Sequence, residues 1–146
     1  MSKSNTFEND LMLLLFNNTN IANIGDAAGL LGSAAAGTFW FSLHTADPCE
    51  TGTAVTSETA YTPYVRVSVA RSGAGLTVTG NSVSPAANVD FAECTAAAGG
   101  PITHFGVVNT SSGAGKLLYS GTVTPSITMA VGVIPRLKTT STITED

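Results

Sequence analysis

Short runs of alternating apolar and polar residues, separated by proline and glycine, constrain the fold of this chain more than any other feature. In residues 39–44, Phe39, Phe41 and Leu43 occupy every second position. This period of two is that of a β-strand, whose side chains point alternately to opposite faces. Residues 64–69 repeat the pattern, with valine at every second position. The sequence therefore predicts strands in both segments.

Further strand-like runs follow, and turn-forming residues separate them. Gly80-Asn81, Gly99-Gly100-Pro101 and residues 111–115 punctuate the chain at the spacing expected of an all-β sandwich or barrel. We therefore predict an all-β fold, a single antiparallel β-sandwich or barrel-like domain over residues 38–146 with an N-terminal helix and an extended arm over residues 1–37. The further strands are expected at Leu76–Thr79, Ser82–Ser84, Val89–Phe91, Ile102–Val108, Lys116–Thr124, Ser126–Ala130 and Arg136–Thr144.

The first residues of the chain follow a helical period instead. The segment Ser4–Phe16 carries an apolar stripe at helical spacing, and Asn5 or Thr6 can cap its start. A helix of about three turns is marginal alone, so the stripe must pack on another surface. We expect that surface to belong to a neighbouring subunit; the alternative is that the helix closes the end of its own sandwich. The stripe consists of Phe7, Leu11, Leu14 and Leu15.

The segment between the helix and the first strand has a different composition. Residues 17–37 are rich first in asparagine and then in glycine and alanine. Such sequence offers few bulky side chains to bury and much backbone freedom. We expect an arm or linker, with a brief helical turn at Asp26–Leu31.

Composition limits the size of the fold and the class of partner. A chain of 146 residues is long enough for one hydrophobic core and short for two ordinary domains. Only 11% of its residues are charged, against roughly a quarter in typical soluble domains. The net charge is −4 and the six Lys and Arg residues are scattered, whereas nucleic-acid binding draws on clustered cations. We therefore expect no nucleic-acid partner.

Two further sequence features bear on compartment and membrane. Cys49 and Cys94 are too few for a disulfide framework, so free thiols are expected, with a single disulfide as the alternative. The apolar run Leu11–Phe16 is much shorter than the about 20 residues that a membrane span requires. It also lacks the pattern of a signal peptide. No membrane association is expected.

Three motifs invite a catalytic or metal-binding interpretation, and each is incomplete. Residues 111–116 end in Gly-Lys like a phosphate-binding loop, but Leu117 stands where that motif has Ser or Thr. Ser42, His44 and Asp47 resemble a nucleophilic triad without its elbow or oxyanion turn. We expect instead that the His44 ring bonds a backbone carbonyl or a turn carboxylate. The Cys and His residues do not form the close pairs of zinc sites. We therefore expect no enzymatic activity, no catalytic or metal-binding residue and no cofactor. The alternative for metals is a surface calcium ion in the loop from Asp47 to Glu58.

Aromatic residues cluster in two of the predicted strands and the turn between them. Flat rings with polar edges can bind sugars or peptides, so a recognition platform is one interpretation. The alternative is that the rings form the core of the sandwich. The residues concerned are Phe39, Trp40, Phe41, Tyr61 and Tyr64.

Taken together, three of these segments resemble a family of small virion proteins of tailed bacteriophages. They read F-W-F-S-L-H-T-A-D-P, Y-T-P-Y-V-R-V-S-V-A-R and I-T-H-F-G-V, and the similarity covers about residues 38 to 124. The resemblance implies a non-enzymatic structural component of the virion, assembled in the host cytoplasm.

Within that class we expect a capsid decoration, or cement, protein that binds and stabilises the assembled head. Its partners would be the major capsid protein and neighbouring copies of itself, in a homo-oligomer. The low charge and the apolar stripe Phe7, Leu11, Leu14 and Leu15 favour such a packed position. The alternative is a tail, fibre or adaptor component involved in receptor attachment.

Overall fold

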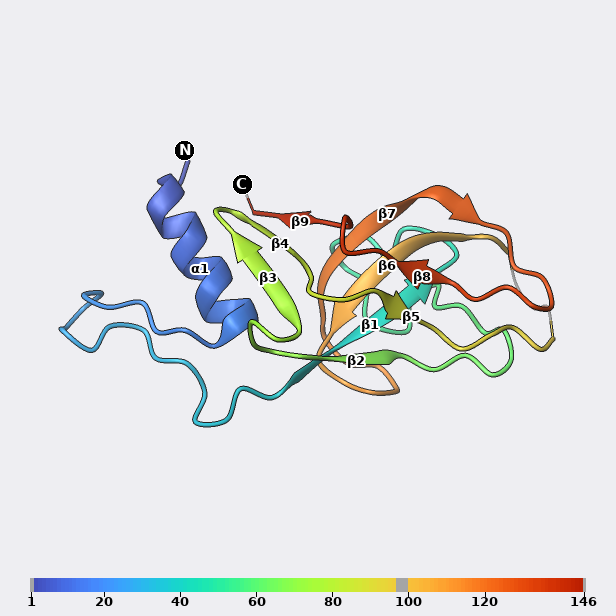
Figure 1. The fold of residues 1–146 in the computed structure, drawn as a ribbon, viewed down its shortest axis with the longest axis horizontal. Coiled ribbons are helices and arrows are strands. Elements are labelled where there is room, and N and C mark those ends of the chain that lie inside the picture. The colour runs from blue at the N-terminus through green and yellow to red at the C-terminus, as the bar shows by residue number, and fades with distance from the viewer. Residues whose placement is uncertain (1, 97–99, 146) are drawn as a thin grey trace. The chain divides into compact units, whose positions relative to one another are not determined.

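A computed structural model of the protein describes residues 2–96 and 100–145. Among the described residues one helix comes first and every later regular element is a strand (Figure 1), which confirms the predicted all-β class with an N-terminal helix. The elements are α1 (Asn5–Asn17), β1 (Thr38–His44), β2 (Val67–Ala70), β3 (Leu76–Thr79), β4 (Ser82–Pro85), β5 (Val89–Asp90), β6 (Ile102–Val108), β7 (Leu117–Ile127), β8 (Arg136–Leu137) and β9 (Ile143–Thr144).

These elements form two compact units, and each unit is assembled from separated stretches of the chain. The first unit contains residues 1–38, 69–88 and 138–146, and the second contains residues 39–68 and 89–137. The N-terminal helix and the segment after it therefore share a unit with two later stretches.

In the first unit, α1 packs on the hairpin of β3 and β4 (Figure 1). Met12 and Phe16, one helical turn apart, are the buried residues of the helix. The predicted cap was wrong: Ser4 rather than Asn5 or Thr6 caps the helix and accepts a hydrogen bond from the amide of Phe7, so the helix begins at Asn5. The hairpin turns through Gly80-Asn81, where Gly80 has a φ of 61° that glycine adopts without strain.

Residues 17–37 form a loop with its own hydrogen bonds rather than a featureless linker. Ile21 and Leu30 exchange two backbone hydrogen bonds, and between them the Asp26 carboxylate accepts from the amides of Ala28 and Gly29. These bonds make a turn at the place where a helical turn was predicted. Asp26 satisfies the amides with its side chain, as Asp commonly does in turns, so the helical prediction was wrong.

Arg71 holds this loop to the end of the helix. Its guanidinium donates to the carbonyls of Leu14 and Leu15, to Asn18 Oδ1, and to Ser33 and Ala36. The last carbonyls of a helix have no partner within the helix and carry partial negative charge. Arg71 therefore caps the C-terminal end of α1, and the same side chain holds the loop through Asn18, Ser33 and Ala36.

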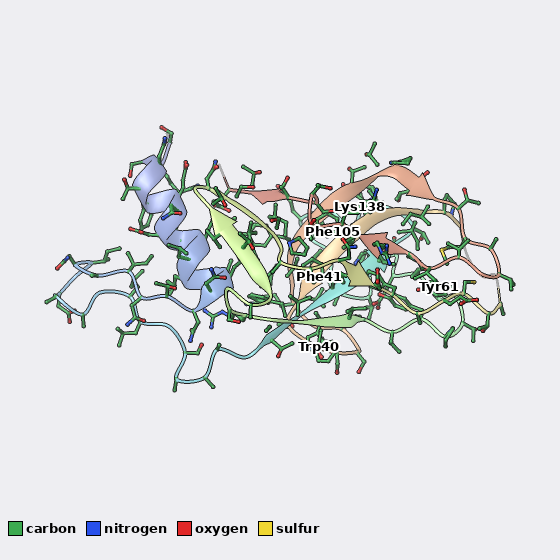
Figure 2. All side chains as sticks on the ribbon, viewed as in Figure 1. Trp40, Phe41, Tyr61, Phe105 and Lys138 are labelled. Atoms are coloured by element: carbon green, nitrogen blue, oxygen red, sulfur yellow. The ribbon has the colours of Figure 1, made fainter. Side chains whose placement is uncertain are left out.

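The larger sheet has the strand order β2-β1-β6-β7, with β1 and β6 antiparallel at its centre. The central strands are almost fully buried, and the rings of Phe41 on β1 and Phe105 on β6 stack with centroids 6.4 Å apart (Figure 2). Gly121 of β7 lies opposite Phe105, and a β-carbon there would meet the Phe105 ring at 2.7 Å. Because Gly121 has no side chain, the Phe105 ring can pack against it.

Several predicted strand boundaries were wrong. The strand predicted in residues 64–69 begins only at Val67, as β2. The chain runs as one strand, β7, through Pro125, where two strands were expected. Proline is tolerated there because β7 is an outer strand and its register with β6 shifts between Thr122 and Ile127. Conversely, the predicted strand Arg136–Thr144 is split into β8 and β9 by a turn in which the Ser141 amide bonds the Lys138 carbonyl.

Candidate functional site

Arg66 and Glu58 form a buried ion pair in the second unit. Nε of Arg66 donates to Oε1 of Glu58, and Nη2 donates to Oε2, each at 2.7 Å. Arg66 is only 5% exposed. A two-point pair of this kind fixes orientation as well as charge, because the planar guanidinium matches the carboxylate.

The remaining donors of Arg66 reach into two surface loops. Nη1 donates to the carbonyl of Thr110, and Nη2 donates to the carbonyls of Ala54 and Gly113. The amide of Ala54 also donates to the carbonyl of Gly115, which joins the loops directly. We call residues 45–58 and 109–116 the clamped loops. One arginine side chain thus bonds to both loops.

Tyr64 completes the cluster. Its hydroxyl donates to Oε1 of Glu58 at 2.8 Å and accepts from the amide of Leu43 on β1. Burial strongly raises the pKa of the Tyr64 hydroxyl, and the hydrogen bond to Glu58 raises the pKa of Arg66. The Tyr64 hydroxyl therefore keeps its proton and Arg66 keeps its charge at physiological pH, so both side chains remain hydrogen-bond donors to Glu58.

Ser42 and His44 do contact each other, as their spacing on one strand predicts. Ser42 Oγ lies 2.8 Å from Nε2 of His44, and Nδ1 lies 2.8 Å from the carbonyl of Thr56. Since a carbonyl only accepts, Nδ1 carries the proton and Nε2 accepts from Ser42. This geometry confirms the expected bond from His44 to a backbone carbonyl.

The pair is not arranged for catalysis. Both side chains have no exposed surface, so no substrate reaches Ser42 in this conformation. The third residue of the sequence motif, Asp47, accepts instead from the amide of Cys49 in its own turn. Burial is the main factor that lowers the pKa of His44 below its ordinary value. His44 is thus a neutral structural residue that attaches β1 to the first clamped loop.

A groove of about 320 Å³ lies beside the first residues of β7. Asp47 and Glu50 place two carboxylates there, and Leu117 and Leu118 add apolar surface. Among residues 2–96 and 100–145, no group of three or more His, Cys, Asp or Glu side chains is placed to hold a metal ion. We call this feature the β7 groove; it is lined by Asp47, Cys49, Glu50, Gly52, Leu117, Leu118, Tyr119 and Ser120.

The two cysteines are separate free thiols. Cys49 is exposed in the β7 groove, and Cys94 is buried. Cys94 lies on an irregular segment, and its backbone amide donates a hydrogen bond to the carbonyl of Val133.

The aromatic residues belong to the core rather than to an exposed platform. Phe39, Phe41 and Tyr61 are buried, and Tyr64 is engaged with Glu58. Trp40 and Tyr64 are the partly exposed members of the set, and Figure 2 places Trp40 apart from Tyr61. The structure therefore supports the second of the two interpretations of this cluster.

The residues of the predicted N-terminal stripe are partly exposed. They flank Met12 and Phe16, which make the buried contacts of α1 in the first unit. The predicted stripe is therefore partly but not fully covered within the chain. Its members are Phe7, Leu11, Leu14 and Leu15.

The sequence reasoning missed the Arg66 cluster. Arg66 was counted only as one of six scattered cations. One pattern could have revealed it: Arg66 follows Tyr64 at the two-residue strand period, so the two side chains share a face, in a chain with few charges. An arginine on such a face needs a buried partner, and Glu58 is the nearest acid in the sequence.

The sequence was also compared with families of known proteins. Residues 2–144 match the family described as Podophage GP4 fiber I protein gp80. This protein belongs to that family. The match covers both units, agrees with the expected phage structural protein, and favours the fibre alternative over capsid decoration. No curated protein matches the chain. In the part of the chain that the structure describes, no helix is long and apolar enough to cross a membrane.

Proposed function

We propose that this member of the gp80 family is a structural component of a phage fibre, acts through binding contacts rather than catalysis, and resides in the virion. The observation that carries the proposal is the family match over residues 2–144, since it extends over nearly the whole chain. The buried position of Ser42 and His44 supports a non-enzymatic role, because the nearest approach to a catalytic group is closed to substrate.

We further propose that the clamped loops form the surface that attaches to a host receptor. Their tips are exposed and rich in hydroxyl and backbone groups, as at Thr51, Thr53, Ser111 and Ser112. A loop already held in its bound conformation loses less conformational entropy on binding. The Arg66 cluster supplies that rigidity to a glycine- and serine-rich segment which would otherwise be flexible.

The apolar stripe on α1 is then the surface for a neighbouring virion protein. Partly exposed leucines on one helix face suit helix-in-groove binding. The sequence led us to expect the major capsid protein and neighbouring copies of this chain as partners. Of these two, the fibre assignment favours another copy of this chain, and it adds a tail component as a candidate. The stripe residues remain Phe7, Leu11, Leu14 and Leu15.

Copy number and location test the fibre assignment. In purified virions, the molar ratio of this protein to the major capsid protein should be far below one, and gold-labelled antibodies should mark the tail. A ratio near one with label over the head would instead establish the decoration role.

Competition for host cells tests the attachment surface. Purified protein should reduce phage adsorption, and Ser112→Arg on a clamped loop should abolish that effect. Thr77→Arg, at an exposed position of β3 in the other unit, is the matched control and should compete like the wild type. Equal competition by both variants would refute the role of the clamped loops and leave the fibre assignment intact.

A further inference from the structure

His44 stands at the junction between β1 and the first clamped loop. It is the last residue of β1, and its Nδ1 donates to the carbonyl of Thr56, near the other end of that loop. The amide of Thr45 also donates to the carbonyl of Ser57. Residues 45–57 therefore close back on the end of β1, and the imidazole of His44 makes a side-chain contact at the point of closure.

Two further groups contact this imidazole, and both belong to the sheet. Nε2 accepts from Ser42 Oγ, and Gly106 of β6 lies so close that a β-carbon there would meet Nε2 at 2.8 Å. His44 has no exposed surface. A second proton would occupy Nε2, which now accepts from Ser42, and would leave a charged ring without water.

In the described part of the chain, the charges around His44 leave a protonated ring without a free counter-ion. Glu58 is the acid that favours the charged ring, but both of its carboxylate oxygens already accept from Arg66. Arg66 and His104 disfavour the charge, and His104 lies opposite His44 in the register of β1 and β6. β7, the next strand of the sheet, contains no Asp, Glu, Lys, Arg or His. A positive imidazole is therefore unpaired while the loop is closed.

We propose that protonation of His44 opens residues 45–57 of the first clamped loop, while the sheet and the second clamped loop keep their structure. Water reaches the ring at lower cost by this route, because a ladder of backbone pairs holds β1 to β6, whereas the loop contributes one carbonyl to the ring. Arg66 keeps its charge and its bonds to the second loop. Burial lowers the pKa of His44 in the closed form, so by linkage the proton favours the open form.

This inference adds regulation to the proposed attachment surface. The opening itself follows from the contacts of His44, and only its consequence for attachment rests on the proposed function. If the first clamped loop contacts the receptor, mild acid should weaken attachment reversibly, because the open loop must be ordered again on binding.

Hydrogen exchange of the full chain between pH 7.5 and 4.5 tests the opening. Mass spectrometry follows the exchange, and the rates are corrected for the intrinsic pH dependence of amide exchange. Protection of residues 45–57 should fall several-fold as the pH drops, whereas protection of β6 and of residues 109–116 should stay constant. The midpoint should coincide with protonation of the His44 ring observed by NMR. His44→Gln lacks the titrating ring and should show no fall, whereas the matched control His104→Gln should respond like the wild type.

The proposal is overturned if protection of residues 45–57 does not change, if β6 loses protection together with the loop, or if the His44 ring stays neutral while protection falls. A fall that persists in folded His44→Gln overturns it as well. The NMR midpoint is measured on the wild type, so it decides the question even where His44→Gln does not fold. Competition for host cells over the same pH range separates the two proposals: opening without loss of competition supports the inference and refutes the attachment role of the first loop.

Discussion

Gly106 on β6 lies so close to His44 on β1 that a β-carbon at position 106 would meet Nε2 of the imidazole at 2.8 Å. The same β-carbon would meet Ser42 Oγ at 2.7 Å. Both contacts are far shorter than real side chains adopt, so the missing side chain of Gly106 is a condition for the Ser42–His44 pair to fit between the strands.

Gly106→Ala should consequently destabilise the fold. Overpacking of a buried site typically costs about 1–3 kcal/mol, because neighbouring side chains must leave their rotamers. Urea unfolding followed by circular dichroism measures the change. Gly73→Ala is the control, since a β-carbon there meets nothing within 4 Å and the free energy of unfolding should stay nearly constant.

Breaking the Arg66–Glu58 pair should cost more than removing both partners. Arg66→Met leaves the Glu58 carboxylate buried without its cation, and such losses are typically about 3–5 kcal/mol. The double variant with Glu58→Leu removes the unpaired charge as well, so it should unfold at a higher urea concentration than Arg66→Met alone. A double variant less stable than the single one would show that the hydrogen bond from the Tyr64 hydroxyl outweighs the cost of the Glu58 carboxylate without its cation.

Acidification should weaken the fold through His44. Its folded-state pKa lies below the ordinary value, so the unfolded chain binds the proton more readily and the native state favours neutral imidazole. The stabilisation is complete above the unfolded pKa of about 6.5 and is lost as the pH falls through the lower folded pKa. Thermal unfolding between pH 8 and 4 should show a loss that is smaller in His44→Gln. Identical pH profiles for the two proteins would contradict this role.

Arg71→Ala should release the loop of residues 17–37. The substitution removes donors from the carbonyls of Leu14 and Leu15 and from Asn18. Loops without such tethers open locally and are cut by proteases. Limited proteolysis followed by mass spectrometry should find faster cleavage within 17–37. Lys138→Ala is the control at an exposed basic residue and should be cleaved there at the wild-type rate.

The two sides of α1 should respond differently to substitution. Phe16→Ala empties a buried site on the helix and should cost about 3–5 kcal/mol of stability. Leu11→Asp falls on the partly exposed stripe, so it should leave the melting temperature nearly unchanged while lowering incorporation into virions. Normal incorporation of a folded Leu11→Asp protein would remove the stripe from the list of binding surfaces.

Local patterns predicted the elements whose causes are local. The alternation in 39–44, the turn at Gly80-Asn81 and the helical spacing before Phe16 each act over a few residues, and the structure contains β1, the β3–β4 hairpin and α1. A bond from His44 to a backbone carbonyl or a turn carboxylate was also predicted, and the structure shows the carbonyl of Thr56.

Long-range contacts were not predictable in the same way. Arg71 meets the end of α1 across more than fifty positions of sequence, and Arg66 meets Gly113 across 47. Nothing near either arginine specifies those partners. The predicted break at Pro125 was wrong for a related reason. A strand tolerates proline when it lies at the edge of its sheet, and the local sequence does not show that β7 lies there.

The assembly of each unit from separated stretches determines how the protein can be handled. Residues 39–68 and 89–137 make up the second unit, and Lys3 and Glu145 form a salt bridge in the first. A fluorophore attached at Ser2 or Thr144 therefore marks the first unit and leaves the clamped loops unmodified. Expression of the second unit alone requires a covalent link from Ser68 to Val89, and a simple truncation at any single position divides at least one of the two units.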